Sequence, residues 1–207
     1  MSEQRYYRRA SFRLSAPTPG ELGPDEGAEV AFAGRSNVGK SSVINCLTGQ
    51  RKLARISGTP GRTQTINVFD LDAERRLIDL PGYGYAKVPA EIKRRWERAL
   101  PDYLQNRRAL RGVVVIMDLR HAPTEQDLQM LGWCASAGLA LHGVLTKADK
   151  LKRGRAKQRL QAVQRSAAEA GVALPSVQLF SALKGEGVEE LSGVLDAWLE
   201  LGNSWRG

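Results

Sequence analysis

The sequence has little cysteine, little histidine and no long apolar run. It contains 2 cysteines and 2 histidines among 207 residues. Cys46 and Cys134 fall inside apolar helical patterns, where we expect small buried side chains rather than a disulfide or metal ligands. His121 and His142 are unclustered, and no stretch approaches the roughly 20 apolar residues of a membrane span. These shortages exclude a disulfide scaffold, a histidine-based metal centre and a membrane-embedded chain.

The sequence offers one substantial core and few signs of division into domains. Hydrophobic residues make up 42% of the chain, which suits a single domain with some extension. We expect an N-terminal extension over 1–28, one α/β domain over 29–201 and a C-terminal tail over 202–207. The start is charged and no signal-peptide-like apolar segment follows it. We therefore expect a cytoplasmic protein with no membrane partner. We also expect a monomer.

Acidic residues are scarce relative to basic ones. There are 31 Lys and Arg against 22 Asp and Glu, a net charge of +9. A solvated helix face explains any single basic cluster, but the clusters together favour a polyanionic partner, and we favour RNA. The clusters are Lys152, Arg153, Arg155, Lys157, Arg159 and Arg165; Lys93, Arg94, Arg95, Arg98, Arg107, Arg108 and Arg111; and Arg5, Arg8, Arg9 and Arg13 beside Tyr6, Tyr7 and Phe12.

Apolar runs alternate with helical patterns along most of the chain. Strands are expected at 29–33, 65–71, 76–79, 112–118, 141–146 and 177–180, with the second and third joined as an antiparallel hairpin. Helical spacing is clearest over 156–170 and 188–198; over 91–108, Pro101 should kink or divide the helix. This alternation predicts a mostly parallel six-stranded sheet with one antiparallel strand and helices on both faces. Ligands of such sheets bind beyond the carboxyl ends of the strands.

A Gly-x-x-x-x-Gly-Lys-Ser string lies between the first expected strand and a helical pattern. This context is typical of a P-loop, in which backbone N–H groups and the helix N-terminus surround phosphates. Lys40 adds a charge near the β- and γ-phosphates, and Ser41 supplies a hydroxyl for Mg²⁺. We call these residues the phosphate loop: Gly34, Arg35, Ser36, Asn37, Val38, Gly39, Lys40 and Ser41.

Two further strings indicate which base is bound. Thr146, Lys147, Ala148 and Asp149 follow the fifth expected strand, and Phe180, Ser181 and Ala182 follow the sixth. A carboxylate at Asp149 accepts hydrogen bonds from N1–H and the 2-amino group of guanine, whereas adenine offers neither donor there. Lys147 can lie over the base, and the N–H of Ala182 can donate to guanine O6. The strings predict a guanine nucleotide and disfavour an ATP-dependent kinase.

A metal and a γ-phosphate contact are expected at two other strings. In Asp79, Leu80, Pro81 and Gly82, the acid can hold Mg²⁺ through water and the Gly82 N–H can reach the γ-phosphate. In Gly61, Arg62, Thr63, Gln64 and Thr65, Thr63 is the best candidate for a second direct Mg²⁺ ligand. The neighbouring Thr59 and Thr65 keep that assignment open.

These strings, together with Asp118-Leu119-Arg120-His121 and Tyr83-Gly84-Tyr85-Ala86, resemble the EngB (YihA/YsxC) family of ribosome-biogenesis GTPases over roughly residues 10–200. The resemblance implies a P-loop NTPase G domain that binds GTP and Mg²⁺ and acts in assembly of the large ribosomal subunit. It also implies a link to bacterial cell division and septation. It selects Ser41 and Thr63 as the Mg²⁺ ligands.

The hydrolytic residues are less defined by sequence. Ras-like GTPases carry a water-orienting glutamine after the Asp-x-x-Gly glycine, but Tyr83 stands there, so slow intrinsic turnover is expected. The catalytic candidates are Lys40, Asn37 and Thr63, and Asn37 matches the asparagine that helps related GTPases hold K⁺. The leading hypothesis is a GTPase switch; the alternative is a GTP-sensing RNA-binding module with incidental hydrolysis.

Overall fold

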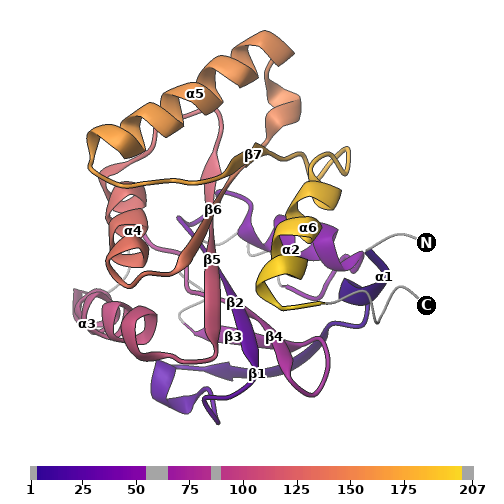
Figure 1. The fold of residues 1–207 in the computed structure, drawn as a ribbon, viewed down its shortest axis with the longest axis vertical. Coiled ribbons are helices and arrows are strands. Elements are labelled where there is room, and N and C mark those ends of the chain that lie inside the picture. Colours follow the sequence, from indigo (N-terminus) through magenta and orange to yellow (C-terminus); the bar gives the residue numbers. More distant parts are fainter. Residues whose placement is uncertain (1–3, 55–64, 85–89, 202–207) are drawn as a thin grey trace.

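A computed structural model describes residues 4–54, 65–84 and 90–201 (Figure 1). Within these residues, one seven-stranded sheet has the order β1-β3-β4-β2-β5-β6-β7. Its strands are β1 (Ser11–Ala16), β2 (Ala28–Gly34), β3 (Ile66–Asp70), β4 (Arg75–Asp79), β5 (Leu110–Asp118), β6 (Ala140–Thr146) and β7 (Val177–Leu179). The helices are α1 (Gln4–Tyr7), α2 (Lys40–Thr48), α3 (Ala90–Asn106), α4 (Glu125–Ser136), α5 (Arg153–Glu169) and α6 (Val188–Trp198), with short 3₁₀ turns at Pro19–Glu21 and Ala148–Lys150.

The sheet confirms the predicted topology and adds one strand to it. All six expected strands are present, and β3 runs against β1 and β4 while the other pairings are parallel. The prediction of six strands was wrong because β1 lies within residues 1–28. That strand is at the edge and exposes most of its side chains, and its pairing shifts register between Phe12 and Leu14. This strand alternates apolar and polar residues and lacks the continuous apolar run by which the others were found.

Both faces of the sheet are covered by helices, which explains the continuous apolar runs of its central strands. In β5, Val113 and Val115 pack into one hydrophobic cluster and Val114 and Ile116 into another, as strand alternation requires. The first cluster includes residues of α3, α4 and α5, and the second includes residues of α1, α2 and α6. Figure 1 shows these two groups of helices on opposite sides of the strands.

Helix α3 continues through Pro101. The prediction that this residue divides the helix was therefore wrong, and a kink there stays a prediction. Leu100, Tyr103 and Leu104 are buried around the proline. Their packing supplies more stabilisation than the one backbone hydrogen bond that proline removes. Within the described residues, no helix combines the length and hydropathy of a membrane-spanning segment.

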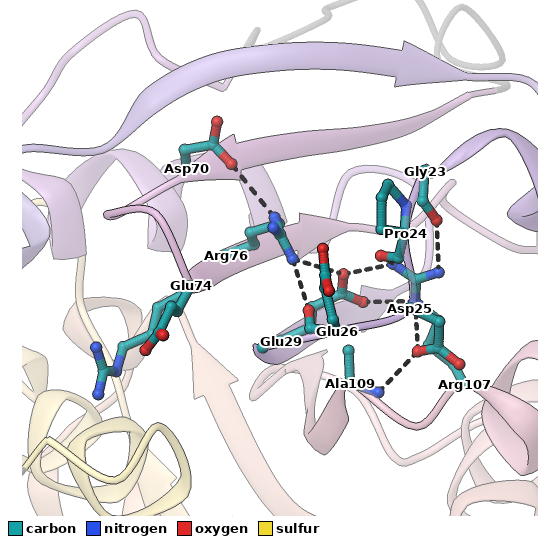
Figure 2. Close-up of polar contacts among 12 residues, drawn as sticks. Gly23, Pro24, Asp25, Glu26, Glu29, Asp70, Glu74, Arg76, Arg107 and Ala109 are labelled. Carbon is teal, nitrogen blue, oxygen red and sulfur yellow. Dashed lines mark hydrogen bonds and ion pairs between the residues drawn. The ribbon is translucent and has the colours of Figure 1, made fainter.

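At the amino-terminal ends of β2 and β4, a buried ion cluster fastens the N-terminal segment to the sheet (Figure 2). Arg107 Nη2 and Nε donate to the Glu29 carboxylate at 2.7 and 3.0 Å, and Arg76 lies 3.6 Å from Glu29. Arg107 also donates to the carbonyls of Gly23 and Pro24. The guanidinium is thereby used inside the fold, so Arg107 does not belong to a basic surface. The sequence placed Arg107 in the second basic cluster, and the fold removes it from that cluster.

Candidate nucleotide-binding site

The segments expected to bind a nucleotide meet at the carboxyl ends of the parallel strands. The phosphate loop follows β2, and Asp79 ends the neighbouring β4. Residues 146–149 follow β6, and residues 180–182 follow β7. Strand β5 lies between these two pairs of strands. The residues expected to bind phosphates therefore lie at β2 and β4, which we call the phosphate side, and those expected to bind the base lie at β6 and β7, which we call the base side.

The phosphate loop is shaped by two glycines. Gly39 has a φ of 107° and is the N-cap of α2. Glycine has no side chain with which to cap the helix, and the partial positive charge of a helix N-terminus suits an anion. A Cβ at Gly34 would lie 2.8 Å from the carbonyl oxygen of Ile116, so the loop starts too close to β5 for any larger residue.

Asp79 is buried beside the phosphate loop and held from two directions. One carboxylate oxygen contacts the Lys40 ammonium, and the other accepts a hydrogen bond from Asn67 Nδ2 at 3.1 Å. Asn67 lies opposite Asp79 in the β3–β4 ladder. Sequence analysis missed Asn67, although the short hairpin that it predicted could have supplied this register.

The residues on the phosphate side suit a magnesium ion. Ser41 lies in the first turn of α2, next to the lysine that contacts Asp79. A hydroxyl and a carboxylate are hard oxygen donors of the kind that Mg²⁺ prefers. Gly61, Arg62, Thr63 and Gln64 lie outside the described residues, so the second expected ligand, Thr63, has no structural account here. Thr65, the next residue, is described and half-buried.

Two side chains on the base side bind back to the phosphate loop. The Thr146 hydroxyl donates to the carbonyl of Val38, and the Lys147 ammonium donates to the carbonyl of Asn37 at 3.1 Å. Lys147 and Asn37 both have positive φ, 62° and 66°, which is uncommon for residues other than glycine. The two halves of the rim are thus joined directly through these contacts.

Asp118, at the end of β5, fixes the position of Lys147. Its Oδ2 accepts from the Lys147 ammonium at 2.8 Å and from Arg120 Nη2 at 2.7 Å. Burial acts to raise the pKa of Asp118, but the hydrogen bonds from Arg120 and Lys147 outweigh it and hold the pKa well below its usual value. The sequence string containing Asp118 carried no assigned role, and this contact supplies one.

Asp149, the residue expected to recognise the base, is held by a hydrogen bond from the other base-side string. Ser181 Oγ donates to Asp149 Oδ1 at 2.8 Å, and this hydrogen bond lowers the pKa of the carboxyl below its ordinary value. Ala148 N–H donates to the carbonyl of Phe180 at 3.1 Å, which joins the two base-side strings. The structure therefore brings Asp149 and Ser181 together and favours an ionised carboxylate at the rim.

The segment after β4 lies against the phosphate loop. Ser36 N–H donates to the carbonyl of Tyr83 at 3.0 Å, and a Cβ on Gly82 would lie 3.0 Å from Ser36 Oγ. The Tyr83 hydroxyl donates to Asp127 Oδ1 at 3.0 Å, on α4, and Arg35 Nε lies 3.6 Å from the other oxygen of Asp127. Sequence analysis missed Asp127, whose only signal was the helix-start pattern that it forms with Thr124.

The basic clusters differ in what the fold leaves accessible. On and just before α5, five residues are exposed and Arg159 is half-buried; the exposed ones are Lys152, Arg153, Arg155, Lys157 and Arg165. Arg94, Arg98, Arg108 and Arg111 are also exposed. Tyr6 and Tyr7, in contrast, are buried, with their hydroxyls on Asp72 and Asp196, so they are not free to stack on bases. The α5 cluster is the strongest candidate surface for a polyanion.

Comparison with known proteins agrees with this geometry. A model of the family described as 50S ribosome-binding GTPase matches residues 29–147. A relative from Nitrosococcus oceani, named probable GTP-binding protein EngB, is 56% identical over 196 residues, covering 95% of this chain and 98% of the relative.

Solved structures share the fold. A crystal structure of a probable GTP-binding protein EngB aligns with a TM-score of 0.70 and 24% identity over 84% of this chain and 100% of that chain. A crystal structure of Era in complex with MgGDPNP and nucleotides 1506–1542 of 16S ribosomal RNA aligns with a TM-score of 0.62 and 24% identity, over 84% of this chain and 57% of that chain. At this identity, the structural likenesses speak to the fold alone. By its sequence relatives and the family model, the chain belongs to the EngB family of GTP-binding proteins.

Proposed function

We propose that the chain is a GTPase switch that acts in the cytoplasm in assembly of the large ribosomal subunit. The observation that carries this proposal is the pairing of Asp149 with Ser181 on the rim that also holds the phosphate loop. The link to cell division and septation rests on family resemblance. The proposed reaction is hydrolysis of GTP to GDP and phosphate.

Guanine selection would follow from the charge of Asp149. Its carboxylate is an acceptor only, and the Ser181 hydrogen bond favours that ionised form. Guanine offers two adjacent donors to it, whereas adenine would leave it facing an acceptor. A polar group left without a partner in a bound complex costs about 1–3 kcal/mol, and a charged group more. ATP should therefore bind far more weakly than GTP.

On the phosphate side, Lys40 and Asp79 would exchange partners when a nucleotide binds. The Lys40 ammonium, which contacts Asp79 in the structure, would turn to the phosphates, and Asp79 would face the metal through water. Ser41 and Thr63 would hold Mg²⁺, which when bound neutralises charge on the β- and γ-phosphates. Asn67 would keep Asp79 in place during this exchange.

Hydrolysis should be slow without a partner. Tyr83 stands where a water-orienting glutamine is found in Ras-like proteins, and a phenol donating to Asp127 cannot take that role. Lys40, Asn37 and Thr63 remain the catalytic candidates. A K⁺ ion held beside the phosphates by Asn37 stays a hypothesis.

A basic surface at α5 supports an RNA partner. Lys152, Arg153 and Arg155 are exposed together at the start of α5, where the chain carries no acid. Lys and Arg side chains bind phosphates in a salt-dependent way, because binding releases condensed counterions. Era, a protein of the same fold, has been crystallised with 16S ribosomal RNA. We propose that rRNA of the large subunit is the partner here.

Co-sedimentation with large ribosomal subunits tests the proposal. The wild-type chain should sediment with them most strongly with a GTP analogue, and less with GDP or without nucleotide. Replacing Lys152, Arg153 and Arg155 together by alanine should weaken binding and flatten its salt dependence by about one unit of log–log slope for each phosphate that the protein no longer neutralises. The matched control replaces Gln158, Gln161 and Gln164, which are exposed on the same helix, by alanine. It should change neither the binding nor its salt dependence.

The alternative is a GTP-sensing RNA-binding module with incidental hydrolysis. The rate of GTP hydrolysis in a single turnover distinguishes it from a switch. A switch should hydrolyse GTP faster in a single turnover when large subunits are added. An unchanged rate together with GTP-dependent binding would favour the sensing module. Equal binding in all nucleotide states would contradict both.

A further inference from the structure

Tyr83 bonds to a helix that no nucleotide-binding string includes. Its hydroxyl donates to Asp127 Oδ1 at 3.0 Å, and Asp127 lies in the first turn of α4. Burial and the adjacent Asp127 carboxylate raise the pKa of Tyr83 well above its ordinary value. The phenol therefore keeps its proton and remains a donor. Tyr83 is thus bonded to the body of the protein by its side chain.

Asp127 is itself fixed in place. Its side chain is 3% exposed, and Oδ2 accepts hydrogen bonds from Thr124 N–H at 2.9 Å and Thr124 Oγ1 at 2.8 Å. The N–H of Asp127 donates back to Thr124 Oγ1, which completes a capping box at the start of α4. Arg35 of the phosphate loop lies 3.6 Å from the same oxygen. One carboxylate therefore joins α4, the phosphate loop and Tyr83.

The backbone on either side of Tyr83 is also confined. Tyr83 N–H donates to the carbonyl of Gly34 at 3.4 Å, and its carbonyl accepts from Ser36 N–H at 3.0 Å. Gly84 has a φ of 75°, and a Cβ there would lie 2.4 Å from Gln126 Oε1 and 3.2 Å from Arg35 Cδ. Residues 82–84 are thus packed between the phosphate loop and α4. A larger residue at Gly84 would have to separate the two.

We propose that Asp127 is a positioning residue that raises the affinity of the site for GTP relative to its affinity for GDP. By holding Tyr83 and Arg35, it keeps Gly82 against Ser36, where the Gly82 N–H can meet a γ-phosphate. GDP has no γ-phosphate, so a loss of this positioning affects GTP more than GDP. This inference rests on the proposed function, because it assumes that a nucleoside triphosphate occupies the phosphate loop.

The variant Tyr83→Phe removes the hydrogen bond and keeps the ring. Affinities for GDP and for the non-hydrolysable analogue GppNHp are measured by calorimetry in magnesium buffer. Loss of a hydrogen bond to a charged acceptor should weaken GppNHp binding by about tenfold, with less than about twofold change for GDP. The matched control is Tyr103→Phe, because the Tyr103 hydroxyl is buried without a hydrogen-bond partner among the described residues. It should leave the ratio of the two affinities unchanged.

A second pair of variants tests whether Tyr83 acts through Asp127. Asp127→Ala should lower the GppNHp-to-GDP affinity ratio at least as much as Tyr83→Phe, and adding Tyr83→Phe to it should change the ratio by less than about twofold further. Equal weakening of both nucleotides, no weakening, or full additivity would overturn the proposal. If the wild-type chain binds neither nucleotide, the proposed function fails and the inference fails with it; wild-type binding with an unchanged ratio in Tyr83→Phe overturns the inference alone.

Discussion

The two ends of the sheet hold buried charges in different ways. At the amino-terminal ends, Arg107 makes four hydrogen bonds, two to Glu29 and one each to the carbonyls of Gly23 and Pro24. The Glu29 side chain is 1% exposed. A planar guanidinium that binds a carboxylate through two N–H groups has few donors left for any other partner. The charges at this end of the sheet therefore stabilise the fold, and we call the Arg107–Glu29 pair with its carbonyl contacts the structural joint.

At the carboxyl ends, two charged side chains of the expected nucleotide site are held through single contacts. Lys40 contacts Asp79 as a single ammonium, and Asp149 receives the Ser181 hydroxyl on one oxygen. An ammonium can change partners more readily than a bidentate guanidinium, because its charge is compact and its stem is flexible. Buried charge alone therefore does not identify a site. What distinguishes Lys40 and Asp149 from Arg107 is that fewer contacts hold each charge.

The largest expected effect comes from breaking the structural joint. Arg107→Met leaves the Glu29 carboxylate buried with Arg76, 3.6 Å away, as its remaining cationic partner among the described residues, so the free energy of unfolding should fall by about 3 kcal/mol. Urea denaturation measures this change. The double variant Glu29→Met with Arg107→Met should recover part of the loss, since the buried Glu29 carboxylate is removed together with its main partner. GDP affinity of the folded variant should stay within about twofold of wild type.

Arg108→Met is the control for that experiment. Arg108 is exposed, and it is its backbone N–H that bonds to Asp25, so the variant keeps this contact. Its unfolding free energy should change by less than about 0.5 kcal/mol. A similar loss in both variants would show that the Arg107–Glu29 pair has no special role, and the contrast between the two ends would fail.

Asp149→Asn should change the free energy of unfolding less than Arg107→Met does, but it should change nucleotide affinity strongly. The amide places a donor where guanine also has donors, so GDP affinity should fall by about a hundredfold, close to 2.7 kcal/mol. Affinity for xanthosine diphosphate should rise, because its 2-oxo group accepts from the amide. Calorimetry with GDP and with xanthosine diphosphate measures both changes in affinity. Asp102→Asn, the same change at an exposed residue, should alter neither. Retained GDP affinity would contradict the base assignment.

The sequence predicted the parts of the fold that repeat a pattern. For example, the strands predicted at 29–33 and 141–146 are β2 (Ala28–Gly34) and β6 (Ala140–Thr146) in the structure. These strands are buried on both faces and read as continuous apolar runs. Strand β1 was missed because it is exposed at the edge. Burial of Tyr6 and Tyr7 was missed as well, since their partners Asp72 and Asp196 are far along the chain.

The same limit applies to the site. The strings that follow strands were placed at one rim because parallel strands share a carboxyl edge. Asp127 was missed because its contact with Tyr83 joins a loop to a helix 44 positions later, and no local pattern reports it. Asp118 likewise acts on Lys147 across neighbouring strands β5 and β6. Sequence motifs that follow strands predict which loops lie together at the rim. The contacts between their side chains depend on strand register and helix packing, which the motifs do not report.

The smallest expected effect is on how the free energy of unfolding depends on pH, through one carboxyl group at each end of the sheet. Hydrogen bonds from Arg120 and Lys147 outweigh the effect of burial and depress the pKa of Asp118; the N–H groups of Ala109 and Arg108 do the same for Asp25 at the opposite end. A depressed folded-state pKa contributes stability above the unfolded value, about 3.9, and that stability is lost as pH falls below it. Asp118→Asn and Asp25→Asn should each flatten the decline of unfolding free energy in acid.

Only one of these two variants should also change ligand binding. Asp118→Asn weakens the charged contact that fixes Lys147 beside Asn37, so GDP affinity at neutral pH should fall severalfold. Asp25 bonds to Arg107, Arg108 and Ala109 at the amino-terminal ends of the strands, and Asp25→Asn should leave GDP affinity unchanged. Denaturation from pH 3 to 7 and calorimetry at pH 7 give both readouts on the same proteins. Equal GDP affinity in both variants would mean that Lys147 does not need Asp118, and that the carboxyl-end charges stabilise the fold in the same way as those at the other end.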